Sequence, residues 1–131
     1  MMHRSRIGVV LLDHPASTYE AAAAFWAAAT GSERSPGGGP PEADPYEPLE
    51  AMGGGVHLEL QRTGPGTPPR VHVDIETDDV EAEVARLTAL GARVTRQHAG
   101  WVVLADPGGM PFCVVPVQTG AAFEGQARTW G

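Results

Sequence analysis

The sequence predicts an α+β domain built from two βαβββ modules, whose strands form a curved sheet, a half-barrel with a cleft between the modules. Three observations support this fold class. The length of 131 residues suits one domain. An apolar strand followed by a helix that ends at a glycine occurs twice, and the two glycines, Gly31 and Gly91, lie about 60 residues apart. Apolar and polar side chains alternate in two segments, 56–61 and 71–76, as half-buried strands require. We therefore expect a single domain over 1–131, with modules at about 7–61 and 70–117 and a C-terminal tail at 118–131.

The first module begins with a strand and a helix. Ile7–Leu12 is a continuous apolar run, which is typical of a buried strand. Ser17 and Glu20 have the spacing of a capping box, which predicts a helix from about 18 to 29. Gly31 is placed to end that helix.

The segment 32–55 is rich in glycine and proline and shows no regular pattern apart from a degenerate strand near 46–52. Long irregular segments in compact domains are often binding loops or lids, and a surface loop without a role is the alternative. Alternation resumes at 56–61 and predicts the last strand of the module.

The second module has the clearer pattern. Residues 71–76 alternate as a strand, Asp78 and Glu81 predict a capped helix over 79–90, and Gly91 ends it. Three further strands are expected at 92–97, 101–105 and 111–117. The tail is weakly patterned, and we expect Phe123 and Trp130 to dock on the domain or on a partner subunit.

If the helices cover the apolar strand faces, the opposite faces carry the candidate site. These faces present the side chains of His57, Glu59, Gln61, His72, Asp74, Glu76, Trp101 and Cys113. Imidazoles and carboxylates that converge can bind a divalent metal ion, and they can equally bind an amine or amide by hydrogen bonds. For His57 and Gln61 a solvated strand face is the better interpretation, and Glu76, near a strand end, is expected to be exposed.

Composition excludes several classes of protein. The net charge of −7 argues against binding to nucleic acid and favours cationic or neutral small molecules. A single cysteine forms no internal disulfide, which fits a cytoplasmic protein. No apolar stretch reaches the roughly 18–20 residues of a membrane span. The remaining histidines, His3, His14 and His98, are interpreted as ordinary surface residues.

Four segments of the second module resemble the glyoxalase/bleomycin-resistance/dioxygenase family, the vicinal oxygen chelate superfamily, and within it the glyoxalase-like subgroup. They are Arg70–Val80, Leu87–Ala92, Trp101–Pro107 and Phe112–Val115. The first module is similar through Val10–Asp13 and Phe25–Gly31. The resemblance implies the paired βαβββ fold and a homodimer. Its members include isomerases, lyases, dioxygenases, thiol transferases and drug-sequestering proteins, so the fold alone does not choose an activity.

The same resemblance places four metal-ligand positions near Val9, Glu59, His72 and Cys113. Val9 cannot ligate a metal, and Cys113 replaces the usual glutamate. We therefore expect an incomplete metal site and no cofactor, with Glu59 and His72 as the ligands if a divalent metal is bound.

Two functional hypotheses remain open. In the first, the protein binds a small cationic aromatic molecule in the cleft without a metal, through aromatic groups such as Trp26 and Trp101 and nearby carboxylates. In the second, it is an enzyme in which His72 and either Glu59 or Asp74 form a catalytic acid–base pair, with or without a divalent metal.

Overall fold

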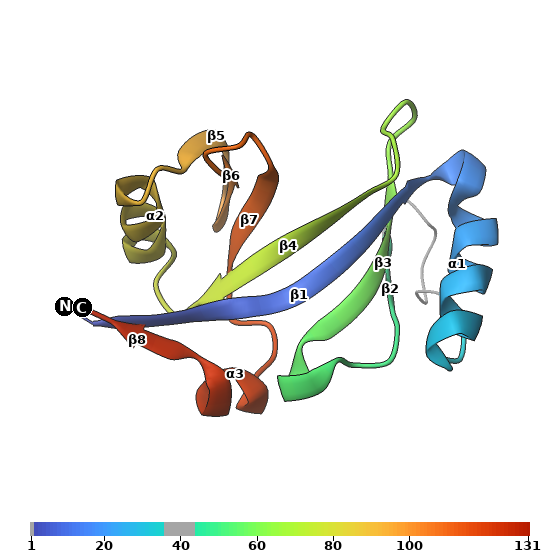
Figure 1. The fold of residues 1–131 in the computed structure, drawn as a ribbon, viewed down its shortest axis with the longest axis horizontal. Helices are drawn as coiled ribbons and strands as arrows, with labels where there is room; N and C mark the ends of the chain where they lie inside the picture. Colours follow the sequence, from blue (N-terminus) through green and yellow to red (C-terminus); the bar gives the residue numbers. More distant parts are fainter. Residues whose placement is uncertain (1, 36–43) are drawn as a thin grey trace. The chain divides into compact units, whose positions relative to one another are not determined.

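The computed structural model describes residues 2–35 and 44–131 (Figure 1). The glycine- and proline-rich part of the predicted loop, 36–43, lies outside the described residues. The elements follow one another as β1 (His3–Pro15), α1 (Ala16–Thr30), β2 (Tyr46–Pro48), a 3₁₀ turn (Gly53–Gly55), β3 (His57–Thr63), β4 (Arg70–Thr77), α2 (Val80–Ala89), β5 (Arg93–His98), β6 (Trp101–Ala105), β7 (Pro111–Pro116), α3 (Ala121–Gln126) and β8 (Arg128–Trp130). This order confirms the predicted α+β class and the repeated strand–helix–strands pattern.

The chain divides into two compact units, which we name after their helices. The α1 unit comprises Val10–Gly53 and His57–His72, and the α2 unit comprises Met1–Val9, Gly54–Val56 and Val73–Gly131. Strands β1 and β4 run through both units, because each begins in one unit and ends in the other.

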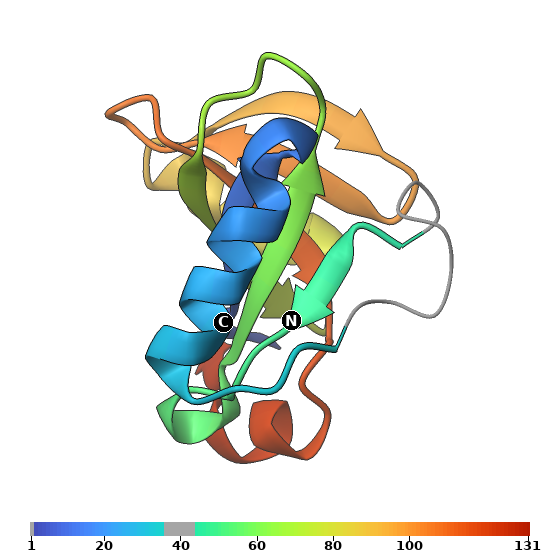
Figure 2. The same ribbon diagram turned by 90° about the vertical axis from the view of Figure 1, so that its right-hand side faces the viewer.

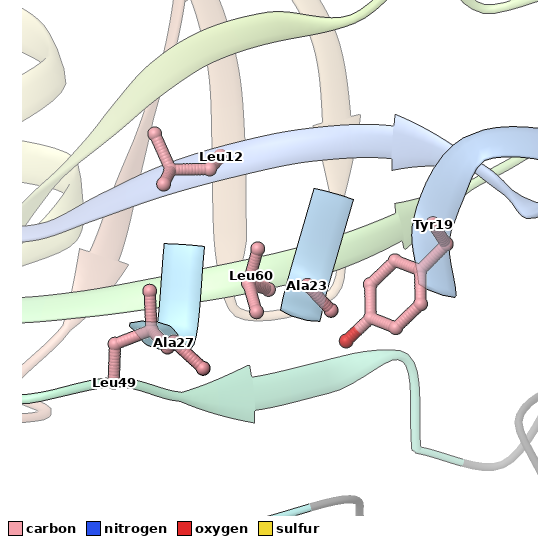
Figure 3. Close-up of a cluster of buried hydrophobic side chains, with 6 residues drawn as sticks. All are labelled: Leu12, Tyr19, Ala23, Ala27, Leu49 and Leu60. Atoms are coloured by element: carbon pink, nitrogen blue, oxygen red, sulfur yellow. The ribbon is translucent and has the colours of Figure 1, made fainter. Parts of the chain in front are cut away.

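In the α1 unit the strands follow the order β2–β3–β1, and β2 is antiparallel to β3 with Tyr46 opposite Gln61. Tyr19, Ala23 and Ala27 recur every four residues and therefore share one face of α1. That face packs on Leu12 and Leu60 (Figure 3), and Figure 2 shows α1 lying along β3. The two alanines let the helix approach the sheet closely, and the core of this unit is small.

Helix α1 starts differently from the prediction. Its N-cap is Pro15, which makes no capping hydrogen bond through its side chain, and Ser17 lies inside the helix. The expected capping box is therefore wrong, because the helix begins directly after β1 and leaves no room for a separate capping loop. The predicted end is confirmed, since Gly31 has a φ of 71° and a left-handed conformation.

In the α2 unit the strands follow the order β1–β4–β7–β6–β5, and β8 pairs with the other side of β1. Strand β4 is parallel to β7, with Ile75 opposite Val114, and β6 is antiparallel to β7 and β5. Helix α2 packs on the apolar faces of these strands (Figure 1). The core consists of Val73, Ile75, Val80, Val84, Leu87, Ala92, Val102, Leu104, Phe112 and Val114.

The cap of α2 is Asp79 rather than the predicted Asp78. The Asp79 carboxylate accepts a hydrogen bond from the Ala82 backbone N–H at 3.0 Å. Asp78 instead accepts one from the Arg4 backbone N–H at 2.8 Å. A contact with a distant strand thus decides which of two adjacent aspartates caps the helix.

The C-terminal tail is structured, which the sequence pattern did not predict. It forms α3 and β8, and β8 is antiparallel to β1 with His3 opposite Trp130. Phe123 is fully buried, and the Trp130 indole N–H donates to the Ser5 hydroxyl at 2.9 Å. Both aromatic residues therefore dock on the domain itself.

Two residues expected at the surface are buried. Glu76 is 0 % exposed, because Arg6 and Thr119 surround its carboxylate with donors. His3 is 8 % exposed, and its Nε2 lies 2.7 Å from a carboxylate oxygen of the buried Glu83. Within the described residues, no helix is long and apolar enough to cross a membrane.

Candidate functional site

His72 on β4 makes a short polar contact with a buried carboxylate. Its Nδ1 lies 2.6 Å from Oδ2 of Asp13, a carboxylate that is 0 % exposed at the end of β1. Because an ionised carboxylate only accepts hydrogen bonds, Nδ1 carries the proton and the lone pair of the neutral ring is on Nε2. The contact therefore fixes both the orientation and the tautomer of the imidazole.

Asp13 was not among the residues predicted from the sequence. The guanidinium of Arg70 donates from Nε to the same oxygen at 3.1 Å, which compensates the buried charge. The other oxygen, Oδ1, is buried and has no hydrogen-bond partner among residues 2–35 and 44–131. The only local indication of this role was the position of the Asp13 carboxylate directly after the apolar run Ile7–Leu12. A polar residue at that position more often simply marks the end of a strand.

Asp74 and Cys113 lie next to each other on neighbouring strands. Asp74 is two residues beyond His72, so the two side chains leave β4 on the same face. The parallel pairing of β4 and β7 places Asp74 opposite Cys113. The donor atoms of His72, Asp74 and Cys113 all lie within 4.8 Å of one another. An imidazole nitrogen, a carboxylate oxygen and a thiol sulfur are the ligand types of zinc sites that keep one position open.

His57 and Glu59 lie on β3. His57 Nδ1 is 3.5 Å from Glu59 Oε2, and their side chains are 42 % and 21 % exposed. Neither belongs to the group formed by His72, Asp74 and Cys113. The Gln61 amide donates to the Tyr46 hydroxyl at 3.3 Å, so this residue pairs β3 with β2.

The two aromatic candidates differ in accessibility. Trp26 packs against the apolar core of the α1 unit and makes an edge-to-face contact with Phe25 at 5.2 Å. Trp101 is 37 % exposed and stacks on the His98 ring, with 3.8 Å between the ring centroids. Trp101 is therefore the better placed of the two to meet a ligand.

Comparison with models of protein families assigns the chain to a family. The family model described as a glyoxalase-like domain matches residues 9–115, which is most of the sequence. The chain belongs to this family. No curated protein matches it.

Solved structures agree with the glyoxalase-like fold. A methylmalonyl-CoA epimerase in complex with methylmalonyl-CoA and NH4+ is 18 % identical, with a TM-score of 0.54 over 88 % of this chain and 97 % of that chain. A hypothetical protein from Bacillus halodurans is 12 % identical, with a TM-score of 0.63 over 89 % and 97 %. A single-residue variant of the Streptomyces coelicolor methylmalonyl-CoA epimerase, in complex with 2-nitronate-propionyl-CoA, is 17 % identical, with a TM-score of 0.51 over 86 % and 98 %. At such low sequence identities, the similarity to these structures shows a shared fold only.

The glyoxalase-like domain keeps part of the ligand pattern that the resemblance implied. Val9 is 2 % exposed and lies among the buried apolar residues, so it fills space and offers no donor. His72 and Cys113 do lie in one group of donors, and Asp74 supplies its third member. The donor chemistry of this chain therefore fits a divalent metal, although the set differs from the expected pair of Glu59 and His72.

Proposed function

We propose that this glyoxalase-like protein is a metal-dependent enzyme that acts on a small molecule, with His72 as a metal ligand. The 2.6 Å hydrogen bond between His72 and the buried Asp13 carboxylate carries the proposal. Histidine ligands in metalloproteins almost always donate their second ring N–H to a carboxylate, a carbonyl or water. Here that bond is made through Nδ1, and Nε2 is the nitrogen whose lone pair can ligate.

Asp74 and Cys113 would complete a set of three ligands with His72. A divalent ion held there would supply Lewis-acid polarisation of a substrate oxygen. The protein's own residues have two other tasks. Asp13 orients the imidazole, and Arg70 donates a hydrogen bond to the same buried carboxylate and helps to hold it in place. We also propose a homodimer, as the family resemblance implies, and a cytoplasmic location, which the single cysteine fits.

The first experiment removes the histidine. After dialysis against a chelator, the wild-type protein is titrated with Co²⁺ and absorption is recorded, because a cobalt–thiolate band reports Cys113 directly. We expect one equivalent to bind, and His72→Ala to weaken binding by about 100-fold or more. His57→Ala, a change of the same kind at a 42 % exposed histidine, should leave the affinity unchanged. The proposal fails if the wild type binds no Co²⁺, or if both variants lose binding equally.

The second experiment tests Asp13 as a positioning residue. Asp13→Asn retains the shape of the side chain but removes the charge, and we expect the Co²⁺ affinity to fall about 10- to 100-fold. Glu59→Gln is the matched control and should have no effect, because Glu59 lies outside the donor group. The position of the cobalt–thiolate band separates an altered metal site from partial unfolding. An unchanged affinity and spectrum in Asp13→Asn would contradict the positioning role.

Metal-free binding of a cationic aromatic molecule is the second candidate function. The exposed Trp101 stacked on His98 favours it, as does the net charge of −7. A wild-type protein that takes up no Co²⁺, but whose tryptophan fluorescence is quenched by a cationic dye, would support this candidate against the first.

A further inference from the structure

A cavity of about 340 Å³ is lined entirely by residues of the α2 unit, and none of them belongs to the donor group of His72, Asp74 and Cys113. Its lining includes Ile75, whose side chain leaves β4 on the face opposite to Asp74 because successive strand residues point to opposite sides. The volume is within the range of small-molecule sites, roughly 300–1,000 Å³. The cavity is lined by Ser5, Arg6, Ile7, Ile75, Glu83, Arg86, Gln126, Arg128 and Trp130.

One wall of this cavity is a fixed polar network in which the charges are already paired. Glu83 is 0 % exposed and receives two hydrogen bonds of 2.8 Å from the Arg86 guanidinium and one of 2.7 Å from the Ser5 hydroxyl. The Arg86 guanidinium also lies over the Trp130 ring, 3.8 Å from its centroid. These contacts hold the wall in place, and Glu83 adds no net negative charge to the cavity.

The second arginine of the lining is also paired. The Arg6 guanidinium donates from Nε to Glu76 at 2.8 Å and from its other nitrogens to Gly54 O, Gly55 O and Thr119 Oγ1. The charge of Arg6 is therefore already neutralised within the fold, and Arg6 adds no net positive charge to the cavity.

Arg128, the third arginine of the lining, differs from Arg86 and Arg6 in its pairing. Its backbone pairs with Ser5 in the β8–β1 ladder, its side chain is exposed, and it makes no ion pair within the described parts of the chain. Beside it, Ile7 is 50 % exposed and Ile75 is partly buried, so an accessible apolar surface lies next to an uncompensated cation. An exposed isoleucine in a concave site is a surface that a ligand can cover.

We propose that this cavity binds a small amphiphilic monoanion, independently of the proposed metal site. The apolar or aromatic body of the ligand covers Ile7 and Ile75, and its carboxylate or sulfonate pairs with the Arg128 guanidinium. Such a ligand meets the one cation of the lining that has no ion-pair partner among the described residues, although the chain as a whole is acidic.

The test uses 8-anilinonaphthalene-1-sulfonate, an aromatic monoanion whose fluorescence rises in apolar surroundings. We expect saturable 1:1 binding to the folded full-length chain, and about tenfold weaker binding in Arg128→Gln, since an ion-paired hydrogen bond is lost. Ile7→Ser should also weaken binding. Arg96→Gln is the charge-matched control, because Arg96 is an exposed arginine on the edge strand β5. The neutral N-phenyl-1-naphthylamine tests the anion requirement, and its binding should not change in Arg128→Gln.

Circular dichroism and the unfolding midpoint establish that each variant is folded. The proposal is wrong if the wild type shows no saturable signal, or if Arg128→Gln binds the sulfonate as tightly as the wild type. It is also wrong if Arg96→Gln weakens binding as much as Arg128→Gln, because the effect would then be one of net charge.

Discussion

Replacing Glu76 by alanine should lower the free energy of unfolding by about 3–5 kcal/mol, because it leaves a buried guanidinium without its counter-charge. The Arg6 side chain is 9 % exposed and the Glu76 side chain 0 %, and their charged atoms lie 2.8 Å apart. Glu76 also accepts hydrogen bonds from the backbone N–H groups of Gln118 and Thr119 at 2.8 and 2.9 Å. The substitution thus leaves one buried positive charge and two backbone N–H donors without their partner inside the α2 unit.

The measurement is urea unfolding followed by circular dichroism, and the control is Glu124→Ala. Glu124 is 67 % exposed and pairs with Arg4 at 3.1 Å, so its loss should cost less than about 1 kcal/mol. Equal losses of stability in the two variants would show that the burial of the Glu76–Arg6 pair has no energetic consequence.

The burial of Glu76 is a feature that could not be predicted from the sequence. The alternation of 71–76 correctly placed Val73 and Ile75 on the face that α2 covers. It could not tell that Glu76 on the other face is buried, because the partners of its carboxylate come from segments 42 to 70 residues away. A Cβ on Gly8 would clash with the carboxyl group of Glu76. The glycine in the first apolar run therefore makes room for this ion pair, and no local pattern shows that.

The candidate site was predictable to a similar extent. Alternation placed His72, Asp74 and Cys113 on strand faces opposite the helices, and the family resemblance put His72 and Cys113 at metal-ligand positions. Asp13 was missed because a hydrogen bond across 59 residues leaves no periodic trace in the sequence. The tail was missed for a related reason. A helix of six residues and a strand of three residues are too short to show a period, and β8 exists through its pairing with β1.

Two buried carboxylates of the α2 unit predict a loss of stability in acid. Burial alone would raise the pKa of Glu83, but hydrogen bonds from Arg86, Ser5 and His3 outweigh it and hold the pKa below its ordinary value. For Glu76, burial likewise acts to raise the pKa, and hydrogen bonds from Arg6, Thr119 and Gln118 lower it overall. In the unfolded chain both groups titrate near their ordinary pKa of about 4.3.

The direction in which stability changes with pH follows from proton uptake. As the pH falls below about 4.5, the unfolded chain binds protons that the folded chain does not, so the free energy of unfolding decreases as pH falls toward the lowered native pKa values. Each such group contributes a slope of up to about 1.4 kcal/mol per pH unit in that window and none well above it. We therefore expect stability to be nearly independent of these carboxylates between about pH 6 and pH 8 and to fall steeply in acid.

Glu83→Gln separates this mechanism from general charge repulsion in acid. The amide cannot titrate, so the slope of unfolding free energy against pH below about 4.5 should become shallower by up to about 1.4 kcal/mol per pH unit. At neutral pH the same variant should be less stable than the wild type, because Arg86 loses its charged partner. Glu124→Gln, at a 67 % exposed position, changes the net charge equally and should leave the slope nearly unchanged. Urea unfolding at half-unit steps from about pH 3 to pH 7 measures both slopes. A slope in Glu83→Gln equal to that of the wild type would mean that Glu83 takes up its proton at the same pH in the folded and unfolded chains, and the buried network would then contribute nothing to stability in acid.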